Sequence, residues 1–350
     1  MNNMITIPVT PADPRLRLLG RMDPEQVPPA LDWTGSGVEF AFRGSAAWVE
    51  LEASEMSPVF WVIVLADDCP VARFPVEPGC RFYPLLLGMD PVTSRTVTLL
   101  KETQCMPDAP AATVFLRSLR LEGELLPLPA RDLKIEFIGD SLTSGEGALA
   151  PKDNDEWITP WFTARGNYAF VACRELNAEM RLLSQSGWGV VWNWEHNAEQ
   201  NMTDAWDYTV GALRGPAAEA RGCRKPWDFS RWQPDIVCIR LLTNDCGGVF
   251  RTSTIEQDRE AIVLGCLALL KKVRASCPAA KIVWILPAAD RHPELALEAI
   301  SRAEQEGLAN LRAFTPPEYG PDDYGARQHP NAAWNVKVGL LLADYLKQLK

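Results

Sequence analysis

The chain changes character at one proline-rich segment, Leu125–Ala130 (LLPLPA). Before it, short apolar stretches alternate with turn signals, and no convincing long amphipathic helix interrupts them. After it, apolar stretches alternate with helical patterns. Proline restricts its own φ and the conformation of the residue before it, so the segment indicates a stiff linker. The 350 residues therefore predict two domains, 1–126 and 133–350, joined by a linker over 127–132, in keeping with about 150 residues per domain.

The first domain is expected to be a β-sandwich of the jelly-roll kind. Larger apolar residues alternate over Val38–Arg43, which is typical of a half-buried strand. The other expected strands cover residues 47–52, 60–65, 95–101 and 113–121. Turn signals such as Asp67-Asp68 and Glu77-Pro78-Gly79 separate them. Short strands at this spacing predict a sandwich or jelly roll.

The second domain is expected to be α/β with a parallel sheet. Apolar stretches predict strands over residues 134–139, 180–184, 235–241, 281–286 and 310–314. Helical patterns cover residues 167–177, 254–276, 294–305 and 332–349, and Thr254–Gln257 matches a capping box. Strands that alternate with helices predict a parallel sheet covered on both faces. Sites in such sheets lie at the carboxyl ends of the strands.

Composition narrows the classes of partner and the compartment. The formal net charge of −10 argues against binding to nucleic acid or to anionic membranes. No apolar run approaches the roughly 18 residues of a membrane span, and the N-terminus has no pattern of a secretory signal. The nine cysteines are an odd number and form no CxxC, which favours reduced thiols over a disulfide framework or a zinc site. We therefore expect a cytoplasmic protein.

Three loops with complementary chemistry follow three of the predicted strands. Ser141 lies in GDSLTSGEG (139–147), Gly187 in SGWG, and Asn244 in TND. Because parallel strands end at one edge of the sheet, these loops are expected to converge. Each residue alone is explained as a helix cap, a plain turn or a strand-end turn. Together they offer a hydroxyl, an unobstructed N–H and a side-chain amide, the parts of a nucleophile with an oxyanion hole.

A serine nucleophile needs a base, and the chain has three histidines. His329 lies in a loop just before the C-terminal helix, where Pro330 and Asn331 fit a helix entry. His292 is the rival, because it also follows a strand and has an acid two residues before it. His196 lies in the aromatic segment after Gly187 and is a candidate for substrate contact. We favour His329 as the base, since the surroundings of His292 are typical of an ordinary helix start.

These four blocks resemble those of the SGNH/GDSL hydrolases. By that resemblance Ser141 is the nucleophile, the Ser141 and Gly187 amides and Asn244 are the oxyanion donors, and His329 is the general base. The order of a β domain and an SGNH domain is more narrowly similar to carbohydrate esterase family 2, as are residues 33–40 and 137–145. The resemblance covers nearly the whole chain and implies a flavodoxin-like three-layer catalytic domain. It also implies removal of acetyl groups from sugars.

Two positions depart from the family pattern. Leu242 stands where the family usually has glycine before Thr-Asn-Asp, which alters backbone freedom but keeps the amide donor. Ala326 stands three residues before His329, where many SGNH enzymes have the aspartate of the triad. The resemblance to family 2 implies that a Ser–His dyad is sufficient, with a backbone carbonyl that orients the imidazole. We therefore expect a dyad, with Asp323 as an uncertain third member. The orienting group in such sites holds the ring and does not take the proton.

Tryptophans are concentrated in the expected active-site loops. Flat aromatic surfaces pack on the C–H faces of sugars, and the indole N–H adds a polar contact. Trp188 is the preferred platform, since it follows an oxyanion donor, and Trp161, Trp192 and Asp140 are the other substrate-binding candidates. Several tryptophans are instead expected in the core, such as Trp284 within a strand pattern.

The predicted function is deacetylation of acetylated manno- or xylo-oligosaccharides through an acetyl-enzyme, which requires no metal or organic cofactor. One alternative is an SGNH lipase-like or thioesterase-like hydrolase of other acyl esters. Another is a non-catalytic sugar-binding protein in which Ser141 is a relic. The first domain is expected to shape one wall of the site, although a separate binding module is the alternative. The sequence permits a homodimer and does not require one.

Overall fold

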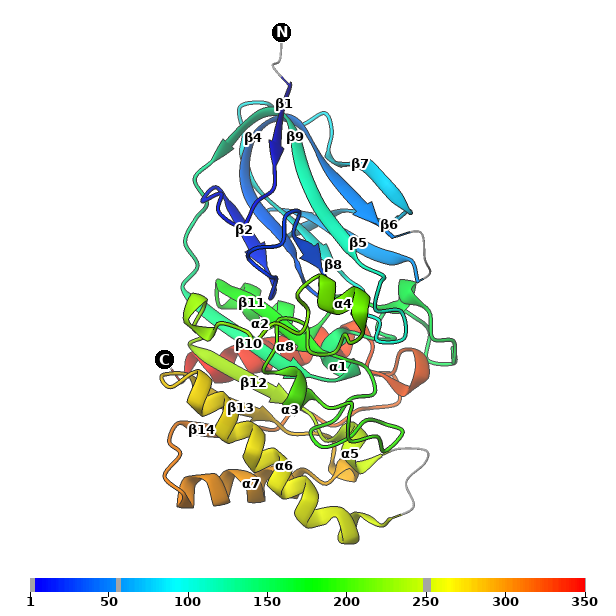
Figure 1. Ribbon diagram of the computed structural model, residues 1–350, viewed down its shortest axis with the longest axis vertical. Coiled ribbons are helices and arrows are strands. Elements are labelled where there is room, and N and C mark those ends of the chain that lie inside the picture. Colours follow the sequence, from blue (N-terminus) through cyan, green and yellow to red (C-terminus); the bar gives the residue numbers. More distant parts are fainter. Residues whose placement is uncertain (1–3, 55–57, 248–252, 350) are drawn as a thin grey trace. The chain divides into compact units, whose positions relative to one another are not determined.

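The computed structural model describes residues 4–54, 58–247 and 253–349. The chain divides into two compact units, coloured along the sequence in Figure 1. The first unit comprises Met1–Ala130 and Leu213–Lys225, and the second comprises Arg131–Ala212 and Pro226–Lys350. Residues 213–225, which the sequence-based division gives to the second domain, thus group with the first unit. Each unit is described by itself below.

The first unit is built on antiparallel strands. In the described part of the chain, nine strands form one sheet with the order β1-β9-β4-β8-β5-β6, and β2 and β7 pair with β4 while β3 pairs with β9. The strands are β1 (Met4–Pro8), β2 (Leu16–Leu19), β3 (Ala30–Leu31), β4 (Gly37–Ala53), β5 (Phe60–Ala66), β6 (Cys69–Val76), β7 (Gly79–Leu86), β8 (Ser94–Lys101) and β9 (Val114–Leu126). The expectation of a β-rich first domain is confirmed at this level.

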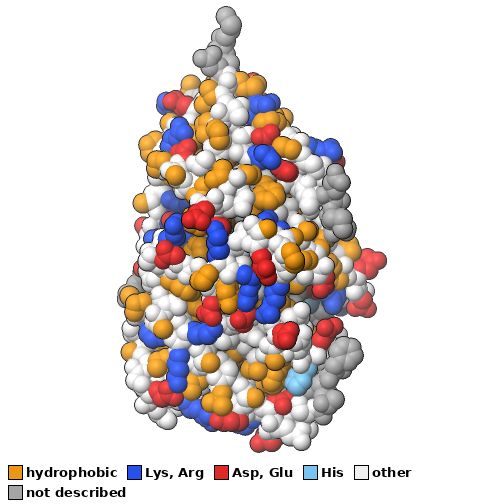
Figure 2. All heavy atoms as spheres, viewed as in Figure 1, with side chains coloured by type: hydrophobic (Ala, Val, Ile, Leu, Met, Phe, Trp, Pro, Cys, Tyr) orange, Lys and Arg blue, Asp and Glu red, His pale blue; other side chains and the backbone are white. Residues whose placement is uncertain are grey.

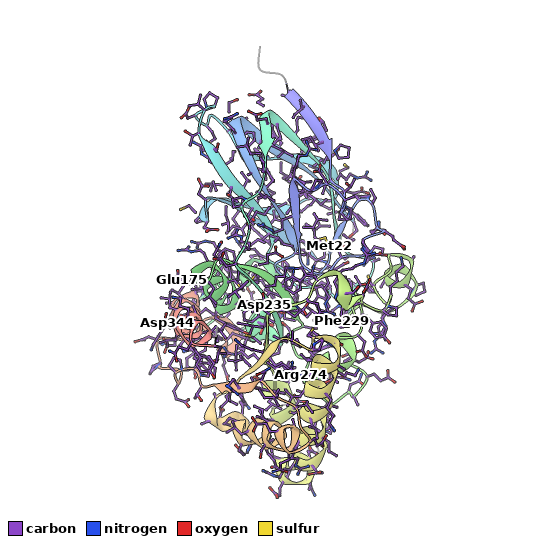
Figure 3. The ribbon with its side chains drawn as sticks, turned by 90° about the vertical axis from the view of Figure 1, so that its left-hand side faces the viewer. Met22, Glu175, Phe229, Asp235, Arg274 and Asp344 are labelled. Carbon is purple, nitrogen blue, oxygen red and sulfur yellow. The ribbon has the colours of Figure 1, made fainter. Side chains whose placement is uncertain are left out.

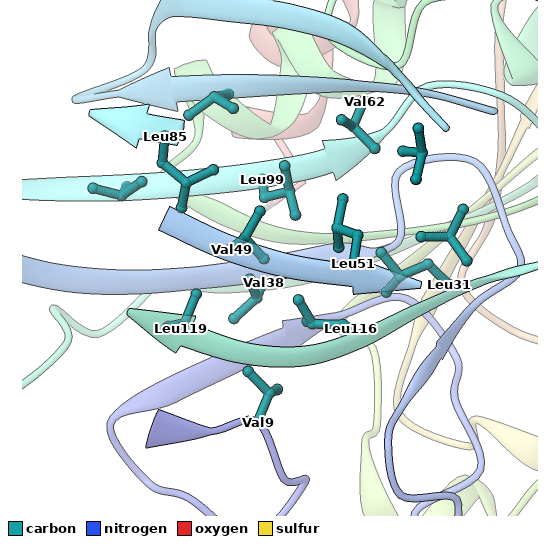
Figure 4. Close-up of a cluster of buried hydrophobic side chains, with 14 of the residues drawn as sticks. Val9, Leu31, Val38, Val49, Leu51, Val62, Leu85, Leu99, Leu116 and Leu119 are labelled. Carbon is teal, nitrogen blue, oxygen red and sulfur yellow. The ribbon is translucent and has the colours of Figure 1, made fainter. Parts of the chain in front are cut away.

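The long strand β4 joins two of the expected strands, 38–43 and 47–52. Its register against β9 shifts between Gly44 and Ala46, which lets one strand bend across the sheet. A Cβ on Gly44 would lie 2.2 Å from the carbonyl oxygen of Glu122, so the close approach of the two backbones requires glycine there. Figure 4 shows the apolar core that these strands enclose, with Val38 and Leu51 of β4 among its fully buried side chains.

The second unit contains a parallel sheet of five strands in the described residues, in the order β11-β10-β12-β13-β14. The strands are β10 (Leu133–Gly139), β11 (Ala178–Ser184), β12 (Ile236–Arg240), β13 (Lys281–Ile285) and β14 (Leu311–Phe314). In chain order this is 2-1-3-4-5, the flavodoxin-like arrangement. The predicted parallel sheet is confirmed.

Helices complete the layers of this unit. They are α1 (Ser141–Ser144), α2 (Tyr168–Glu175), α3 (Met202–Ala205), α5 (Thr243–Cys246), α6 (Ile255–Ser276), α7 (Pro293–Gln305) and α8 (Ala332–Lys347), whereas α4 (Pro216–Ala220) belongs to the first unit. Side chains of α2 and α8 share one buried cluster with strand residues such as Phe137 and Cys238. Helices α6 and α7 lie side by side (Figure 1) and are joined by ion pairs such as Arg259 with Glu298. The capping box at Thr254 and Gln257 begins α6 as predicted.

The amino ends of the parallel strands are fixed by structural contacts. Asp235, labelled in Figure 3, precedes β12, and its carboxylate accepts the backbone N–H of Lys134 at 2.8 Å. Arg274, near the end of α6, donates to the carbonyl of Ala280 at 2.8 Å and to that of Ala309 at 2.7 Å. The chemistry-bearing loops lie at the opposite, carboxyl ends of the strands.

None of the helices in the described ranges is long and apolar enough to cross a membrane. On the face drawn in Figure 2, acidic and basic side chains are interspersed among apolar ones. The net negative charge of the chain is therefore not gathered into one patch on that face.

Candidate active site

Ser141 lies in a tight turn between β10 and α1. Asp140 caps this short helix, and its Oδ1 accepts the backbone N–H of Leu142 at 3.0 Å. A Cβ on Gly139 would lie 2.0 Å from Oγ1 of Thr143, so the strand can turn this sharply into the helix only with glycine there. The sequence GDSLT thus folds so that the serine occupies the first helical position at the carboxyl end of the sheet.

His329 meets Ser141 as predicted. Its Nε2 lies 2.8 Å from Oγ of Ser141, although the two residues are 188 positions apart in the chain. The loop that carries the ring leads into α8, where the side chain of Asn331 caps the helix by accepting the N–H of Trp334. A hydroxyl and an imidazole at this distance have the geometry of a nucleophile and its base.

The other two histidines contact different partners. Nδ1 of His292 lies 2.9 Å from Oε1 of Glu294, at the start of α7. The ring of His196 packs edge-on against Trp192, with 4.3 Å between ring centroids. The hydrogen bond to Ser141 therefore belongs to His329 and not to its rival, His292.

The structure does not bring Asp323 to the imidazole. Oδ2 of Asp323 accepts the backbone N–H of Gly320 at 2.7 Å, within its own loop. Among the described residues, the buried Nδ1 of His329 has no hydrogen-bond partner. The geometry is that of a dyad, without a side-chain acceptor on the far nitrogen.

Apart from the amide of Ser141, the predicted oxyanion donors follow the two strands next to β10. In the sheet, Gly139 lies opposite Ser184 of β11 and Arg240 of β12, so the loops after all three strands leave the same edge. Nδ2 of Asn244 donates to the carbonyl of Trp188 at 3.0 Å, which ties its loop to the Gly187 loop. An amide group has two N–H donors, so a second one remains for an oxyanion. Gly187 itself has a φ of 77°, which a residue with a Cβ rarely adopts.

Asp245 fixes the loop that follows Gly187. Its carboxylate accepts the backbone N–H of Val190 at 2.8 Å and that of Val191 at 2.8 Å. A Cβ on Gly189 would lie 2.3 Å from Oδ2 of this carboxylate, so glycine is needed for the loop to approach it. Burial raises the pKa of Asp245, whereas the backbone N–H groups lower it. The TND block thus supplies one candidate donor and also the anchor of the neighbouring loop.

Asp140 is fully buried and serves as the cap of α1, so the structure does not expose it to a substrate. Burial raises its pKa to about 6, although Arg240, the N–H of Leu142 and His329 all act to lower it. Arg240 is also buried, and its guanidinium lies 5.0 Å from the ring centroid of Tyr168. The carboxylate next to Ser141 in the chain therefore caps α1 and interacts electrostatically with Arg240 and His329.

The tryptophans chosen from the sequence are mostly buried. Trp188 is 4% exposed and Trp192 is 8% exposed, and Trp161 is half-buried. The exposed rings in these loops are Trp157, at 38%, and Trp194, at 36%. A Cβ on Gly187 would lie 3.7 Å from Cβ of Trp194, whereas a Cβ on Gly247 would lie 2.6 Å from Cζ3 of the Trp194 ring. The side chain of Trp194 therefore starts beside Gly187, and its ring lies against Gly247. A sequence pattern does not reveal which of several neighbouring indoles turns outward.

Two supporting features have no functional signal in the sequence. Nδ2 of Asn167 donates to the carbonyls of Leu142 and Thr143, at 2.8 and 3.0 Å, and so holds the serine turn from the start of α2. Glu146 forms an ion pair with Arg327 and joins the serine segment to the histidine segment. Asn167 is detectable only as a helix start, and the Glu146 pair spans 181 positions of the chain.

The described residues contain no group of three or more His, Cys, Asp or Glu side chains arranged to hold a metal ion. The groups gathered at the carboxyl edge of the sheet are a hydroxyl, an imidazole and amide donors. Such a set is suited to acyl transfer by a nucleophilic serine.

No protein-family model matches the chain. A cellulase/esterase from Acetivibrio thermocellus is 27% identical over 337 residues, which are 91% of this chain and 37% of that relative. The chain therefore spans little more than a third of the length of this curated relative.

Solved structures match over almost the full chain. An acetyl xylan esterase from the rumen bacterium Butyrivibrio proteoclasticus superimposes with a TM-score of 0.92 at 27% identity, covering 99% of this chain and 98% of that one. A family two carbohydrate esterase from Clostridium thermocellum, solved in complex with cellohexaose, gives a TM-score of 0.82 at 25% identity and covers 95% and 98% of the two chains.

The parallel sheet and the serine–histidine pair at its carboxyl edge are the features that the chain shares with the SGNH/GDSL hydrolases. Within that class, the resemblance to carbohydrate esterase family 2 is confirmed over nearly the whole chain.

Proposed function

We propose that this protein is a carbohydrate acetyl esterase that removes O-acetyl groups from acetylated oligosaccharides of the manno or xylo type. The observation that carries the proposal is the 2.8 Å contact between Nε2 of His329 and Oγ of Ser141. The acetyl xylan esterase from Butyrivibrio proteoclasticus, which matches this chain over 99% of its length, supports the choice of an acetylated glycan.

In the first half of the reaction, Oγ of Ser141 attacks the acetyl carbonyl while Nε2 of His329 takes the hydroxyl proton. The carbonyl oxygen becomes an oxyanion, which the N–H groups of Ser141 and Gly187 and the amide of Asn244 stabilise. Each fixed donor of this kind contributes about 10²- to 10³-fold in rate. Collapse of the tetrahedral intermediate passes the proton from His329 to the sugar oxygen and leaves an acetyl-serine.

In the second half, His329 takes a proton from water, whose oxygen attacks the acetyl-serine carbonyl. The same donors stabilise the second oxyanion. Collapse then releases acetate, and the proton on His329 returns to Oγ of Ser141. Each half uses one proton transfer through the same imidazole, so the cycle needs only water and the ester.

The catalytic arrangement is a dyad in this proposal. The carboxylate of Asp323 is engaged by the N–H of Gly320, so it does not act on the ring. The carboxylate with an electrostatic interaction with the imidazole is that of Asp140, whose pKa His329 acts to lower. The carboxylate that stabilises a protonated imidazole is thus assigned to Asp140 rather than to Asp323.

The sugar platform is assigned first to Trp194, since this residue is 36% exposed and its Cβ lies beside Gly187. Apolar C–H faces of a pyranose pack on such a ring, and ligand pockets are rich in aromatic side chains. Trp188 and Trp192 are only 4% and 8% exposed. In this proposal they stabilise the loop and do not contact the sugar.

For the first unit we propose a jelly roll that shapes one wall of the substrate site.

For the compartment we propose the cytoplasm. The substrate there would be imported acetylated oligosaccharides rather than intact polymer. The mixed charge on the face in Figure 2 is compatible with a neutral glycan as partner.

The test is analysis of the products by NMR after incubation with acetylated manno- and xylo-oligosaccharides. We expect acetate and a deacetylated sugar from the wild type and none from Ser141→Ala. The position of the lost acetyl signal identifies the hydroxyl, and the preferred substrate identifies the glycan. Nitrophenyl esters from acetyl to octanoyl, measured in parallel, separate an acetyl esterase from a lipase-like enzyme.

Two results would contradict the proposal. Faster hydrolysis of octanoyl than of acetyl esters would indicate a deep acyl groove and a lipase-like enzyme. Absence of labelling by a serine-directed phosphonate would indicate a sugar-binding protein without an activated hydroxyl.

A further inference from the structure

The backbone just before His329 adopts a strained conformation. Arg327 has a φ of 53° and Gln328 a φ of 60°, so two successive residues with side chains lie in the left-handed region. This conformation is unfavourable for residues other than glycine, because Cβ comes too close to the following carbonyl oxygen. Such strain persists only where surrounding contacts enforce it, and it is frequent next to functional groups.

The serine segment supplies those contacts. The N–H of Ala326 donates to the carbonyl of Gly147 at 3.0 Å, and the N–H of Arg327 donates to that of Asn154 at 2.9 Å. A Cβ on Gly147 would lie 2.5 Å from the carbonyl oxygen of Ala326 and 3.2 Å from Cβ of His329. The histidine segment therefore lies directly on residues 147–154, which continue from the serine turn.

One ion pair joins the same two segments through side chains. Nη1 of Arg327 lies 2.5 Å from Oε1 of Glu146, whose side chain is only 5% exposed, whereas that of Arg327 is 39% exposed. A carboxylate so deeply buried is costly unless it is paired. The pair therefore stabilises the position of Arg327 relative to the serine segment more firmly than an exposed pair would.

The imidazole depends on this backbone for its orientation. Within the described ranges, its Nδ1 has no acceptor, and Ala326 has no polar side chain to offer one. Nε2 is 2.8 Å from Oγ of Ser141, so the far side of the ring is not fixed by a hydrogen bond. The ring is placed by the course of residues 326–329.

We propose that the Glu146–Arg327 ion pair is a positioning device that holds residues 327 and 328 in the left-handed conformation and so keeps His329 on Ser141. The inference rests on the proposed function, because it assigns how the base of that reaction is oriented without a side-chain acceptor. Glu146 and Arg327 act through the backbone and do not contact the reacting atoms.

The first test is Glu146→Gln, which keeps the shape of the side chain and removes its charge. A small displacement of a catalytic group can lower a rate by about 100-fold, so we expect kcat to fall about 10- to 100-fold while KM changes less than about twofold. Labelling of Ser141 by a serine-directed phosphonate should slow by a similar factor. Arg327→Met should behave like Glu146→Gln, and Arg327→Lys should recover most of the loss.

The second test uses glycine, which adopts the left-handed conformation without strain. Arg327→Gly should retain a higher kcat than Arg327→Met, although both lack the ion pair. In the Arg327→Gly background, Glu146→Gln should cost little further. A pair that only stabilised the fold would give no such advantage to glycine.

Glu260→Gln is the matched control, since Glu260 pairs with Arg302 between α6 and α7, where its side chain is 62% exposed. This variant should leave kcat and the labelling rate unchanged. Wild-type kcat in Glu146→Gln would overturn the inference. So would a rise of KM at constant kcat, which would make Glu146 a substrate-binding group, or an equal loss in Arg327→Gly and Arg327→Met.

The phosphonate separates this inference from the proposed function, because it reports on the serine–histidine pair without a sugar. Labelling of the wild type together with no deacetylation of any oligosaccharide would contradict the proposed function alone. Unchanged labelling in Glu146→Gln would contradict the positioning role alone. No labelling of the wild type would contradict both.

Discussion

Leu242 has a backbone conformation that suits glycine better than leucine. Its φ is 97°, yet its side chain is fully buried at the start of α5, directly before the TND block. The left-handed region costs a leucine roughly 1–2 kcal/mol, and burial of its side chain contributes about 1.5–3 kcal/mol in the opposite direction. The departure from the glycine of the family pattern therefore exchanges backbone strain for packing.

This balance predicts an unusual order of stability. Leu242→Ala removes the packing and keeps the strain, whereas Leu242→Gly removes both. We expect the glycine variant to be more stable than the alanine variant by about 1 kcal/mol, the reverse of the usual order. Denaturation by urea measures the difference, and an alanine variant of equal or greater stability would show that the left-handed backbone carries no strain.

Asp140 predicts a dependence of stability on pH. Burial raises its pKa from the ordinary 3.8 to about 6. Between these values the folded protein holds a proton that the unfolded chain has released. The stability from this group is therefore fully present below pH 3.8 and is lost as the pH rises through about 6.

Asp140→Asn removes this titration and keeps a good helix cap. The free energy of unfolding of the wild type, minus that of the variant, should fall by roughly 3 kcal/mol between about pH 4 and pH 7. Denaturation curves at several pH values give this difference. A difference that does not change with pH would mean that Asp140 has an ordinary pKa in the folded protein.

At the scale of elements, the loop from Gly187 to Trp192 depends on one carboxylate. Oδ1 of Asp245 accepts the N–H groups of Val190 and Val191, and Oδ2 also accepts that of Val190. An amide would put an NH₂ group in place of one acceptor and would remove the negative charge. We expect Asp245→Asn to lower kcat by at least about tenfold, because the Gly187 donor moves with the loop. Steady-state kinetics on an acetyl ester measure it, and unchanged kcat would show that this anchor does not position the donor.

The sequence predicts strands with uninterrupted apolar runs and misses strands that contain proline. Phe60–Leu65 is an uninterrupted apolar run, and β5 (Phe60–Ala66) matches it. Strands β6 and β7 are not predicted, because β6 contains Pro70 and Pro75, β7 contains Pro84, and neither shows clean alternation. The turn between β5 and β6 is predicted correctly: Asp67 and Asp68 adopt positive φ values of 49° and 63°.

The same contrast holds in the site. The serine and histidine segments carry local signals, and the structure brings Ser141 and His329 together. Asp323 is a candidate third catalytic residue because it lies close to His329 in the sequence. In the structure, however, its carboxylate accepts the N–H of Gly320. Contacts such as Glu146 with Arg327 depend on two segments far apart in sequence and on a strained backbone, neither of which leaves a pattern.

At the scale of the molecule, the first unit is discontinuous in sequence: it consists of residues 1–130 and of a second segment, residues 213–225. Arg221 of this second segment is nearly buried. Its guanidinium lies 2.9 Å from the carbonyl oxygen of Pro110 and 3.5 Å from Oδ1 of Asp32. Lys225, by contrast, is half-exposed and pairs with Asp23 and Glu25. The segment is thus attached to the first unit by one buried cation and one exposed cation.

These two cations form a matched pair of variants. Arg221→Met removes one charged partner of the buried Asp32 carboxylate, which keeps the hydrogen bond from Thr113 and the charge of Lys101. The variant should lower the free energy of unfolding by about 1.5–3 kcal/mol. Lys225→Met removes only an exposed pair and should change stability little. Thermal denaturation compares the stability of the two variants. Equal losses of stability would show that residues 213–225 are not anchored at Arg221.

The most direct measurement is the rate at which a serine-directed phosphonate labels the wild type, His329→Ala and His292→Ala. The account predicts wild-type labelling in His292→Ala and a loss of at least about 10³-fold in His329→Ala, because the nucleophile then lacks its base. Rapid labelling of His329→Ala, or a comparable loss in His292→Ala, would contradict the assignment of His329 as the partner of Ser141.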